Sequence, residues 1–221
     1  MIKRSTVIFF VVSCMLVLFG CNGGAVSRNQ NNMEMDGLLK QTIYAPTSAI
    51  FIDLPADMKI GSSTKDAVIP ELKPYLSNHG TSFPPQQSYF GESNKKEFEV
   101  TFRAIYMSYN VEAIQKQTGQ PFTPNLDGGV AMYTQSMERA ANSGSKNVQN
   151  LQWNVKKIIV DDMSARLVTM QFNKNGHLIV NKMLFVVCND DMWEIGFNCN
   201  GKSEKAIKLV DKILLNIKFM K

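Results

Sequence analysis

The chain has 221 residues, of which 44% are apolar, and this length suits one domain with a sizeable core. The formal net charge is +5, and two of these charges come from Lys3 and Arg4, in a segment that we expect to be removed. The remaining +3 is too small to indicate a nucleic-acid-binding protein, which needs a concentrated basic face.

Residues 1–20 have the three parts of a secretory signal. Lys3 and Arg4 form a positively charged start, residues 7–19 are almost all apolar, and Gly20 is a small residue before the expected cleavage point. The apolar run is shorter than the roughly 20 residues that a membrane-spanning helix needs. We therefore expect a cleaved signal peptide over residues 1–20, with an uncleaved N-terminal anchor as the alternative.

The end of this segment, Leu18-Phe19-Gly20-Cys21, resembles a bacterial lipobox. The resemblance implies that a diacylglyceryl group is attached to the sulfur of Cys21 and that this residue becomes the acylated first residue of the mature chain. Two acyl chains are generally enough for stable anchoring. Asn22 follows the cysteine, and the absence of an aspartate there favours the outer membrane if the organism has one. The expected location is extracytoplasmic, on the cell membrane or the outer membrane.

Residues 21–40 are rich in Asn, Gln, Gly and Ser and show no apolar period, which predicts a flexible spacer after the lipidated cysteine. No second linker of this kind follows, so residues 41–221 are predicted to form a single globular domain. Cys188 and Cys199 lie on neighbouring strands of a predicted hairpin, at opposite ends of it. Because a disulfide requires Cα atoms within about 7 Å, we expect two separate, buried thiols.

Two patterns dominate the predicted secondary structure. Residues 97–107 alternate apolar and polar side chains, which predicts a strand with one buried face. The C-terminal third reads as strand after strand joined by short turns, and residues 177–188 are apolar on both faces, which indicates a central strand. The predicted strands are 49–55, one that starts near 58, 97–107, 153–160, 166–172, 177–188 and 192–199. The predicted helices are an irregular one over 64–77, then 110–116, 129–142 and an amphipathic one that Ser203 caps.

Strands joined by tight turns pair in antiparallel fashion, so the predicted class is α+β, an antiparallel meander covered by helices. The order of elements resembles the PsbP-like fold. Three stretches carry the resemblance: Phe51–Pro55 with Met58–Ile60, the run Val155–Cys199, and the closing segment Ile213–Phe219. The resemblance implies an α/β/α sandwich that acts as a non-enzymatic binding or accessory module.

The sequence offers little that indicates catalysis, a metal or a cofactor. The only histidines, His79 and His177, each adjoin a glycine in a predicted turn, with no Cys, Asp or Glu at ligand spacing. The paired acids Asp161-Asp162 and Asp190-Asp191 are typical of turns, where carboxylates accept hydrogen bonds from backbone amides. We therefore expect a protein that is not an enzyme and holds no cofactor, although a triad assembled only in space is not excluded.

Aromatic residues gather with prolines in predicted loops and are the candidate partner contacts. These residues are Phe83, Tyr89, Phe90 and Phe122. The alternative is that they pack under the loops as a small satellite core. The expected function is a membrane-anchored binding or accessory module for a protein or envelope component. A small-ligand-binding or immunity-type lipoprotein is the first alternative, and an envelope hydrolase is the second.

Overall fold

The computed structural model describes residues 27–28, 37–65, 86–93, 99–144 and 148–220. Its strands are β1 (Ser27–Arg28), β2 (Leu38–Tyr44), β3 (Ala49–Pro55), β4 (Lys59–Lys65), β5 (Gln86–Glu92), β6 (Val100–Ser108), β7 (Gln149–Val160), β8 (Met163–Lys174), β9 (His177–Cys188), β10 (Asp191–Asn200) and β11 (Lys218–Met220). Its helices are α2 (Val111–Thr118), α3 (Leu126–Asn142) and α4 (Glu204–Leu215). The predicted signal peptide, Cys21, His79 and Phe83 lie outside the described residues.

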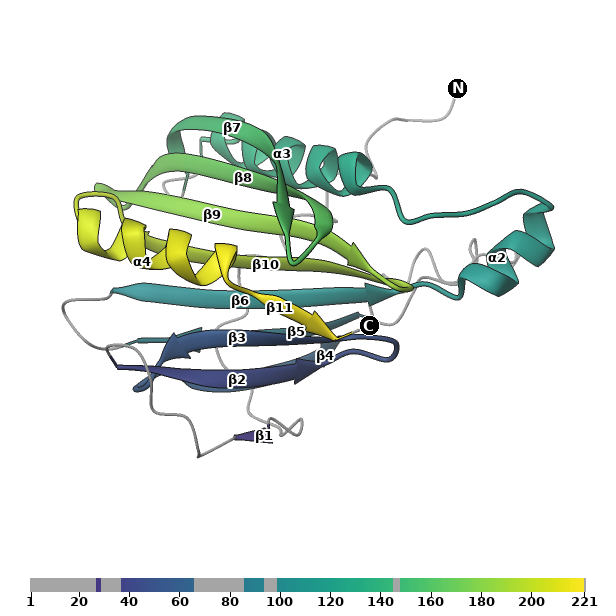
Figure 1. Ribbon diagram of the computed structural model, residues 1–221. Coiled ribbons are helices and arrows are strands. Elements are labelled where there is room, and N and C mark those ends of the chain that lie inside the picture. Colours follow the sequence, from purple (N-terminus) through teal and green to yellow (C-terminus); the bar gives the residue numbers. More distant parts are fainter. Residues whose placement is uncertain (1–26, 29–36, 66–85, 94–98, 145–147, 221) are drawn as a thin grey trace, which may run out of the picture.

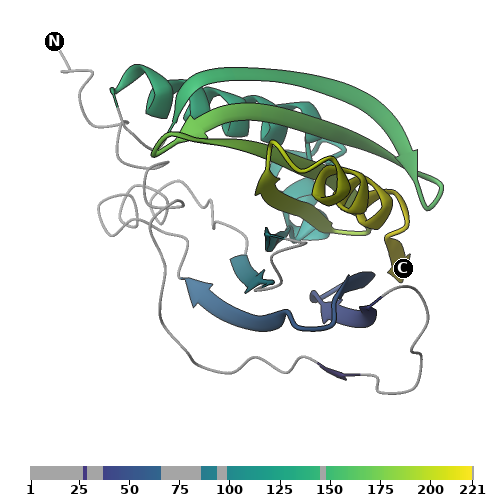
Figure 2. The same cartoon turned by 90° about the vertical axis from the view of Figure 1, so that its left-hand side faces the viewer.

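Two antiparallel sheets form the framework (Figure 1). The large sheet has the strand order β4-β5-β6-β10-β9-β8-β7, and the small sheet has the order β1-β2-β3-β11. Helix α3 covers one face of the large sheet, and α4 lies on the other face in the same layer as the small sheet (Figure 2). This arrangement is the antiparallel α+β class that the sequence predicts.

A hydrophobic core lies on each side of the large sheet, because its strands alternate their side chains between the two faces. The larger core joins the large sheet to α4 and the small sheet, and includes the fully buried Trp193 and Phe102. The smaller core joins α3 to β8 and β9 and includes Met137 and Phe185. Strand β9 contributes to both cores, which confirms the central position predicted from its two apolar faces.

The helices begin where side chains can satisfy their first backbone amides. The Oδ1 atom of Asn125 accepts from the amide of Gly128 at 3.0 Å, which starts α3. The hydroxyl of Ser203 accepts from the amide of Ala206 at 3.2 Å, which starts α4 and confirms the predicted cap.

Three boundaries in the first half of the domain differ from the sequence-based prediction. Leu38, Leu39 and Lys40 belong to β2, although they were expected in the spacer, because pairing with β3 orders them and buries Leu38. The end of β4 occupies positions 64 and 65, which were expected to begin a helix. Residues 86–92 form β5 between β4 and β6, where a loop was expected.

Cys188 and Cys199 are free and buried, as predicted. In the pairing of β9 with β10, Cys188 lies opposite Asp191 beside the turn, while Cys199 lies opposite Val180 near the far end. Burial raises the pKa of the Cys199 thiol to about 11, so this thiol is protonated at neutral pH.

Candidate functional site

An open cleft of about 640 Å³ lies where the chain enters α3, and we call it the α3 cleft. Its walls come from the segment before the helix, from the first residues of β8 and from the end of β9. Its lining includes Pro124, Asn125, Asp127, Ser164, Arg166 and Val187. The cleft therefore opens at one end of the large sheet, directly after the predicted contact residue Phe122.

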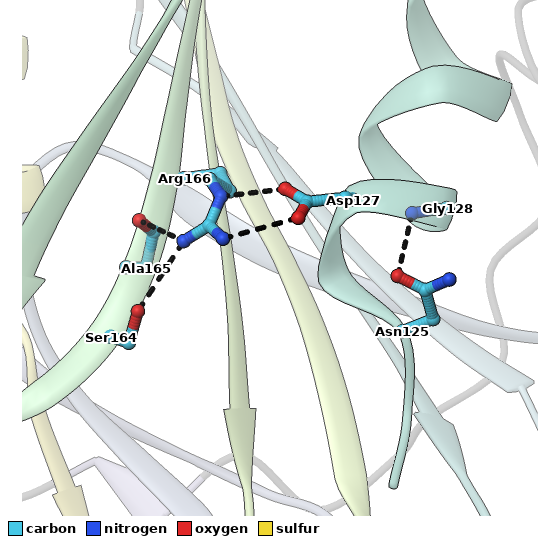
Figure 3. A network of polar contacts seen from close by, with 6 residues as sticks. All are labelled: Asn125, Asp127, Gly128, Ser164, Ala165 and Arg166. Atoms are coloured by element: carbon cyan, nitrogen blue, oxygen red, sulfur yellow. Dashed lines mark hydrogen bonds and ion pairs between the residues drawn. The ribbon is translucent and has the colours of Figure 1, made fainter.

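A bidentate ion pair forms one wall of the α3 cleft (Figure 3). Arg166 Nε donates to Asp127 Oδ1 at 2.7 Å, and its Nη2 donates to Oδ2 at 3.3 Å. The arginine side chain is only 12% exposed, and its Nη1 also donates to Ser164 Oγ and to the carbonyl of Ala165. The hydrogen bond from Arg166 lowers the pKa of Asp127 below that of an ordinary aspartate. The pair fixes the start of α3 to β8 and gives the cleft a polar wall.

Beyond the cleft, α2 stands clear of the end of the sheet (Figure 1). None of its residues is buried. The helix is held through its ends: Asn110 caps it by accepting from the amide of Ala113, and the ring of Phe122 packs on Tyr109 with centroids 5.6 Å apart. We call residues 109–122 the arm. It places Phe122 at the junction between α2 and the α3 cleft.

A second polar feature lies on the α3 side of β9, β10 and β6. We call it the Glu194 face and define it by Thr101, Arg103, Asn181, Glu194 and Asn198. Burial raises the pKa of Glu194 to about 6, and the nearby Arg103 offsets part of that rise. Perturbed carboxyl groups of this kind are frequent where proteins bind or transform polar ligands.

A chain of hydrogen bonds crosses the Glu194 face from helix to sheet. The hydroxyl of Tyr133 in α3 donates to Asn181 Oδ1 at 2.9 Å, and the amide group of Asn181 donates to Asn198 Oδ1 at 2.9 Å. The amide group of Asn198 in turn donates to Thr101 Oγ1 at 3.1 Å. Burial raises the pKa values of Tyr133 and Tyr109, and the charge of Glu194 raises them further. Both phenols therefore stay neutral, and the Tyr133 hydroxyl keeps its hydrogen bond to Asn181.

The acid pairs have structural roles in the described fold. Asp161 and Asp162 form the turn between β7 and β8 with φ angles of 49° and 63°, and Asp161 Oδ2 accepts from the amide of Phe219 at 2.8 Å. Asp191 is fully buried and accepts from Ser48, Ser108 and the amide of Thr47. The turn prediction holds for Asp161, Asp162 and Asp190, whereas Asp191 begins β10 and is a buried link between the sheets that the sequence did not predict.

The aromatic residues that were predicted to contact a partner differ in how far the structure exposes them. Tyr89 is part of the larger core, only 5% exposed, because it lies on β5 rather than in a loop. Its hydroxyl donates to the carbonyl of Tyr44 at 3.1 Å. Phe90 is 37% exposed and lies over Gly61 on the neighbouring strand. Phe122 is half-buried in the arm.

Sequence reasoning missed Asp127, Arg166 and Glu194. Nothing in the sequence marks Glu194, because it falls at a polar position in the regular alternation of apolar and polar residues along β10. Within the described ranges, no group of three His, Cys, Asp or Glu side chains is placed to hold a metal ion. The helices found there are all too short or too polar to cross a bilayer.

No protein-family model and no curated protein matches the sequence. Solved structures with a similar arrangement include CyanoP, the cyanobacterial PsbP of Synechocystis sp. PCC 6803, at 9% identity and a TM-score of 0.49, with 92% of this chain and 99% of that chain covered. LpqN, involved in cell envelope biogenesis of Mycobacterium tuberculosis, matches at 10% identity and a TM-score of 0.38, with 84% and 93% covered. A Pseudomonas aeruginosa protein of unknown function, PA94, matches at 11% identity and a TM-score of 0.32, with 78% and 91% covered. Identities this low concern the fold alone.

Proposed function

We propose that this protein is a lipid-anchored accessory protein of the bacterial cell envelope, which binds a protein partner through its arm and the adjoining α3 cleft. In this proposal the domain is not an enzyme. It recognises its partner with a surface at one end of the large sheet, while Cys21 holds the chain at a bilayer.

The observation that carries the proposal is that α2 buries no residue of its own. Isolated helices shorter than about 12–15 residues are marginal in water, and α2 has 8 residues. Helices of this length normally gain their stability by packing an apolar face. Val111 and Ile114, the large apolar residues of α2, are only half-buried. A protein partner that packs against these side chains would supply the missing contact.

The envelope location is supported by the sequence. The segment Leu18-Phe19-Gly20-Cys21 has the residue types that lipoprotein processing requires, and the apolar run before it is of signal-peptide length. Removal of this segment would leave every described element intact, since β1 begins at Ser27.

The second candidate function is the binding of a small polar ligand at the Glu194 face. It is favoured by a carboxylate of raised pKa that faces an arginine and two tyrosines. A carboxylate in this setting suits a ligand with hydroxyl or amide groups, which can donate to Glu194.

The proposed contact between the arm and a partner can be tested by capturing bound proteins from native cells with two matched variants. Ile114→Asp places a charge on the apolar side of the arm, while Met132→Asp places the same charge on the outer side of α3, where Met132 is 69% exposed. We expect cross-linking followed by mass spectrometry to recover a partner with the wild type and Met132→Asp but not with Ile114→Asp. Recovery of the same proteins with both variants, at equal yield, would rule out the arm as the contact.

The anchor is tested separately by replacing Cys21 with serine. We expect the wild type to sediment with membranes and to be released by detergent but not by high salt, whereas Cys21→Ser should appear in the aqueous fraction. Membrane retention of Cys21→Ser through residues 1–20 would instead support the uncleaved anchor.

A further inference from the structure

Positive charge is concentrated at the C-terminal end of the chain. Residues 202–221 contain six lysines and two acidic residues, a net charge of +4 out of +5 for the whole sequence. Lys3 and Arg4 supply another +2, so residues 21–201 carry a net charge of −1. The domain is therefore not uniformly basic. Its excess of positive charge lies on and around α4.

The lysines of α4 form one stripe on its outer side. Lys205, Lys208, Lys212 and Leu215 follow one another at intervals of three, four and three residues, which places them on one helix face. The opposite face carries the buried residues Ala206, Val210, Ile213 and Leu214. The Lys208 side chain is 78% exposed and Leu215 is 53% exposed. The stripe thus ends in an apolar residue that points away from the core.

The small sheet extends this outer surface beside α4. Phe219 in β11 packs into the core, so its neighbours Lys218 and Met220 point outward. Met220 and Tyr44 both lie opposite Ala49 in the register of the sheet and are 46% and 48% exposed. Three exposed apolar side chains, from α4, β11 and β2, therefore accompany the lysines on one layer of the molecule.

The proposed lipid anchor reaches the same layer. Ser27 of β1 pairs with Thr42 of β2 and is six residues from Cys21, and six residues of fully extended chain span at most about 20–22 Å. The small sheet has the order β1-β2-β3-β11, so β11 is about 14 Å from β1 at the usual strand spacing. A bilayer that holds Cys21 is thus close to the edge of the layer that contains α4.

We infer that the outer surface of α4 and the small sheet rests on an anionic lipid bilayer, with the α4 lysines at the phosphate groups and Leu215, Met220 and Tyr44 at the interface. The orientation of the domain rests on the lipid anchor proposed above, whereas the affinity of the surface for anionic lipid does not. Clustered lysines are attracted to anionic headgroups, and apolar and aromatic side chains favour the interface next to them. In this orientation α3 faces away from the membrane, since it covers the opposite face of the large sheet (Figure 2).

The test uses residues 22–221, which keep every described element and lack the lipid. Binding is measured by co-sedimentation with vesicles of phosphatidylcholine alone and with vesicles that contain phosphatidylglycerol as a second lipid. The variant Lys205→Gln/Lys208→Gln/Lys212→Gln is compared with Lys116→Gln/Lys157→Gln/Lys174→Gln, which removes three exposed lysines from other elements. Both variants change the net charge equally.

We expect binding only to the phosphatidylglycerol vesicles, a loss of about tenfold or more for the α4 variant, and little change for the control variant. Binding should weaken as salt is raised and should survive an excess of soluble glycerol phosphate. Equal loss for both variants, no binding to either vesicle, or competition by glycerol phosphate would overturn the inference. Because this chain lacks the lipid, failure here is distinguishable from failure of the anchor, which membrane fractionation of Cys21→Ser reports.

Discussion

The carboxylate of Asp191 accepts a hydrogen bond of 2.6 Å from the hydroxyl of Ser48, although 143 residues separate them in the chain. The same serine oxygen accepts from Trp193 Nε1 at 2.9 Å. Ser48 belongs to the turn between β2 and β3, and Asp191 begins β10, so this relationship ties the small sheet to the large one. A buried carboxylate that receives several hydrogen bonds is stable only while its partners stay in place.

Replacement of Asp191 by alanine should therefore be strongly destabilising. The change leaves Ser48, Ser108 and the amide of Thr47 without their acceptor in a dry environment, at a cost of about 3 kcal/mol. Urea unfolding should show this loss in the free energy of unfolding. Thermal unfolding should show a melting temperature lower by roughly 10 °C. Asp190→Ala, one residue earlier, is the matched control and should change stability little. Equal losses of stability in the two variants would mean that the hydrogen bonds to Asp191 add no stability of their own.

Glu194 should make the domain less stable as the pH rises past 6. Its folded pKa of about 6 exceeds the ordinary value of 4.5, so the native state binds the proton more tightly than the unfolded state. The contribution of the protonated acid is fully present below pH 4.5 and is lost as the pH rises through 6. Glu194→Gln should remove this dependence and stabilise the domain at pH 7–8 by up to about 2 kcal/mol. Unfolding curves from pH 4 to 8 measure the difference. A variant curve parallel to the wild type would contradict the raised pKa.

Arg166→Ala should destabilise the docking of α3 by about 1–2 kcal/mol, since it removes a nearly buried side chain with four hydrogen-bond contacts. Asp127→Asn should have a smaller effect, because the Asp127 side chain is 69% exposed and solvent screens its charge. Since the pKa of Asp127 is lowered, its small contribution is present above pH 4 and is lost as the pH falls below that value. Amide hydrogen exchange of α3 in the two variants measures the asymmetry. Faster exchange in Asp127→Asn than in Arg166→Ala would reverse this assignment.

Phe122→Ala should loosen the arm and leave the rest of the fold unchanged. Phe122 packs on Tyr109, and no residue of α2 belongs to either core. We expect the melting temperature to stay within about 2 °C of the wild type, because surface changes outside the core usually cost less than 0.5 kcal/mol. Limited proteolysis should cut the variant faster within residues 110–121. A large fall in melting temperature would show instead that Phe122 is a core residue.

The two thiols should be unreactive in the folded protein. Cys188 and Cys199 are buried and form no disulfide, and burial raises the pKa of Cys199 to about 11. An aromatic disulfide reagent should therefore react slowly until denaturant is added and then titrate both thiols of the 22–221 chain. Thermal unfolding should be the same with and without a reducing agent. A lower melting temperature under reduction would reveal a disulfide.

The second half of the fold could be predicted from sequence because its signals are local. The bounds of β9 and the cap of α4 depend on alternation and on one serine, which neighbouring residues alone reveal. Strand β5 was missed because its polar sequence shows no alternation, and Tyr89 becomes buried only through partners on β4 and β6. The pairs Arg166–Asp127 and Asp191–Ser48 join residues far apart in the chain, so no spacing rule could bring them together.

Of the predicted contact residues that the structure describes, only Phe122 lies beside the α3 cleft, because aromatic residues near prolines can equally well be core or surface. The prediction that Tyr89 is an exposed contact residue was wrong, because Tyr89 is buried in the core. Phe90 lies on a strand, over Gly61, rather than in a loop. The charge concentrated on α4 could have been counted from the sequence. Its meaning depends on knowing that the opposite face of the helix is buried.

The most direct test of the envelope assignment is mass spectrometry of the N-terminal peptide from the protein isolated out of its native membrane. We predict a peptide that begins at Cys21 and carries a diacylglyceryl group on the sulfur, with or without a further acyl chain on the amine. An intact N-terminus that retains residues 1–20, or a peptide beginning at an unmodified cysteine, would contradict it.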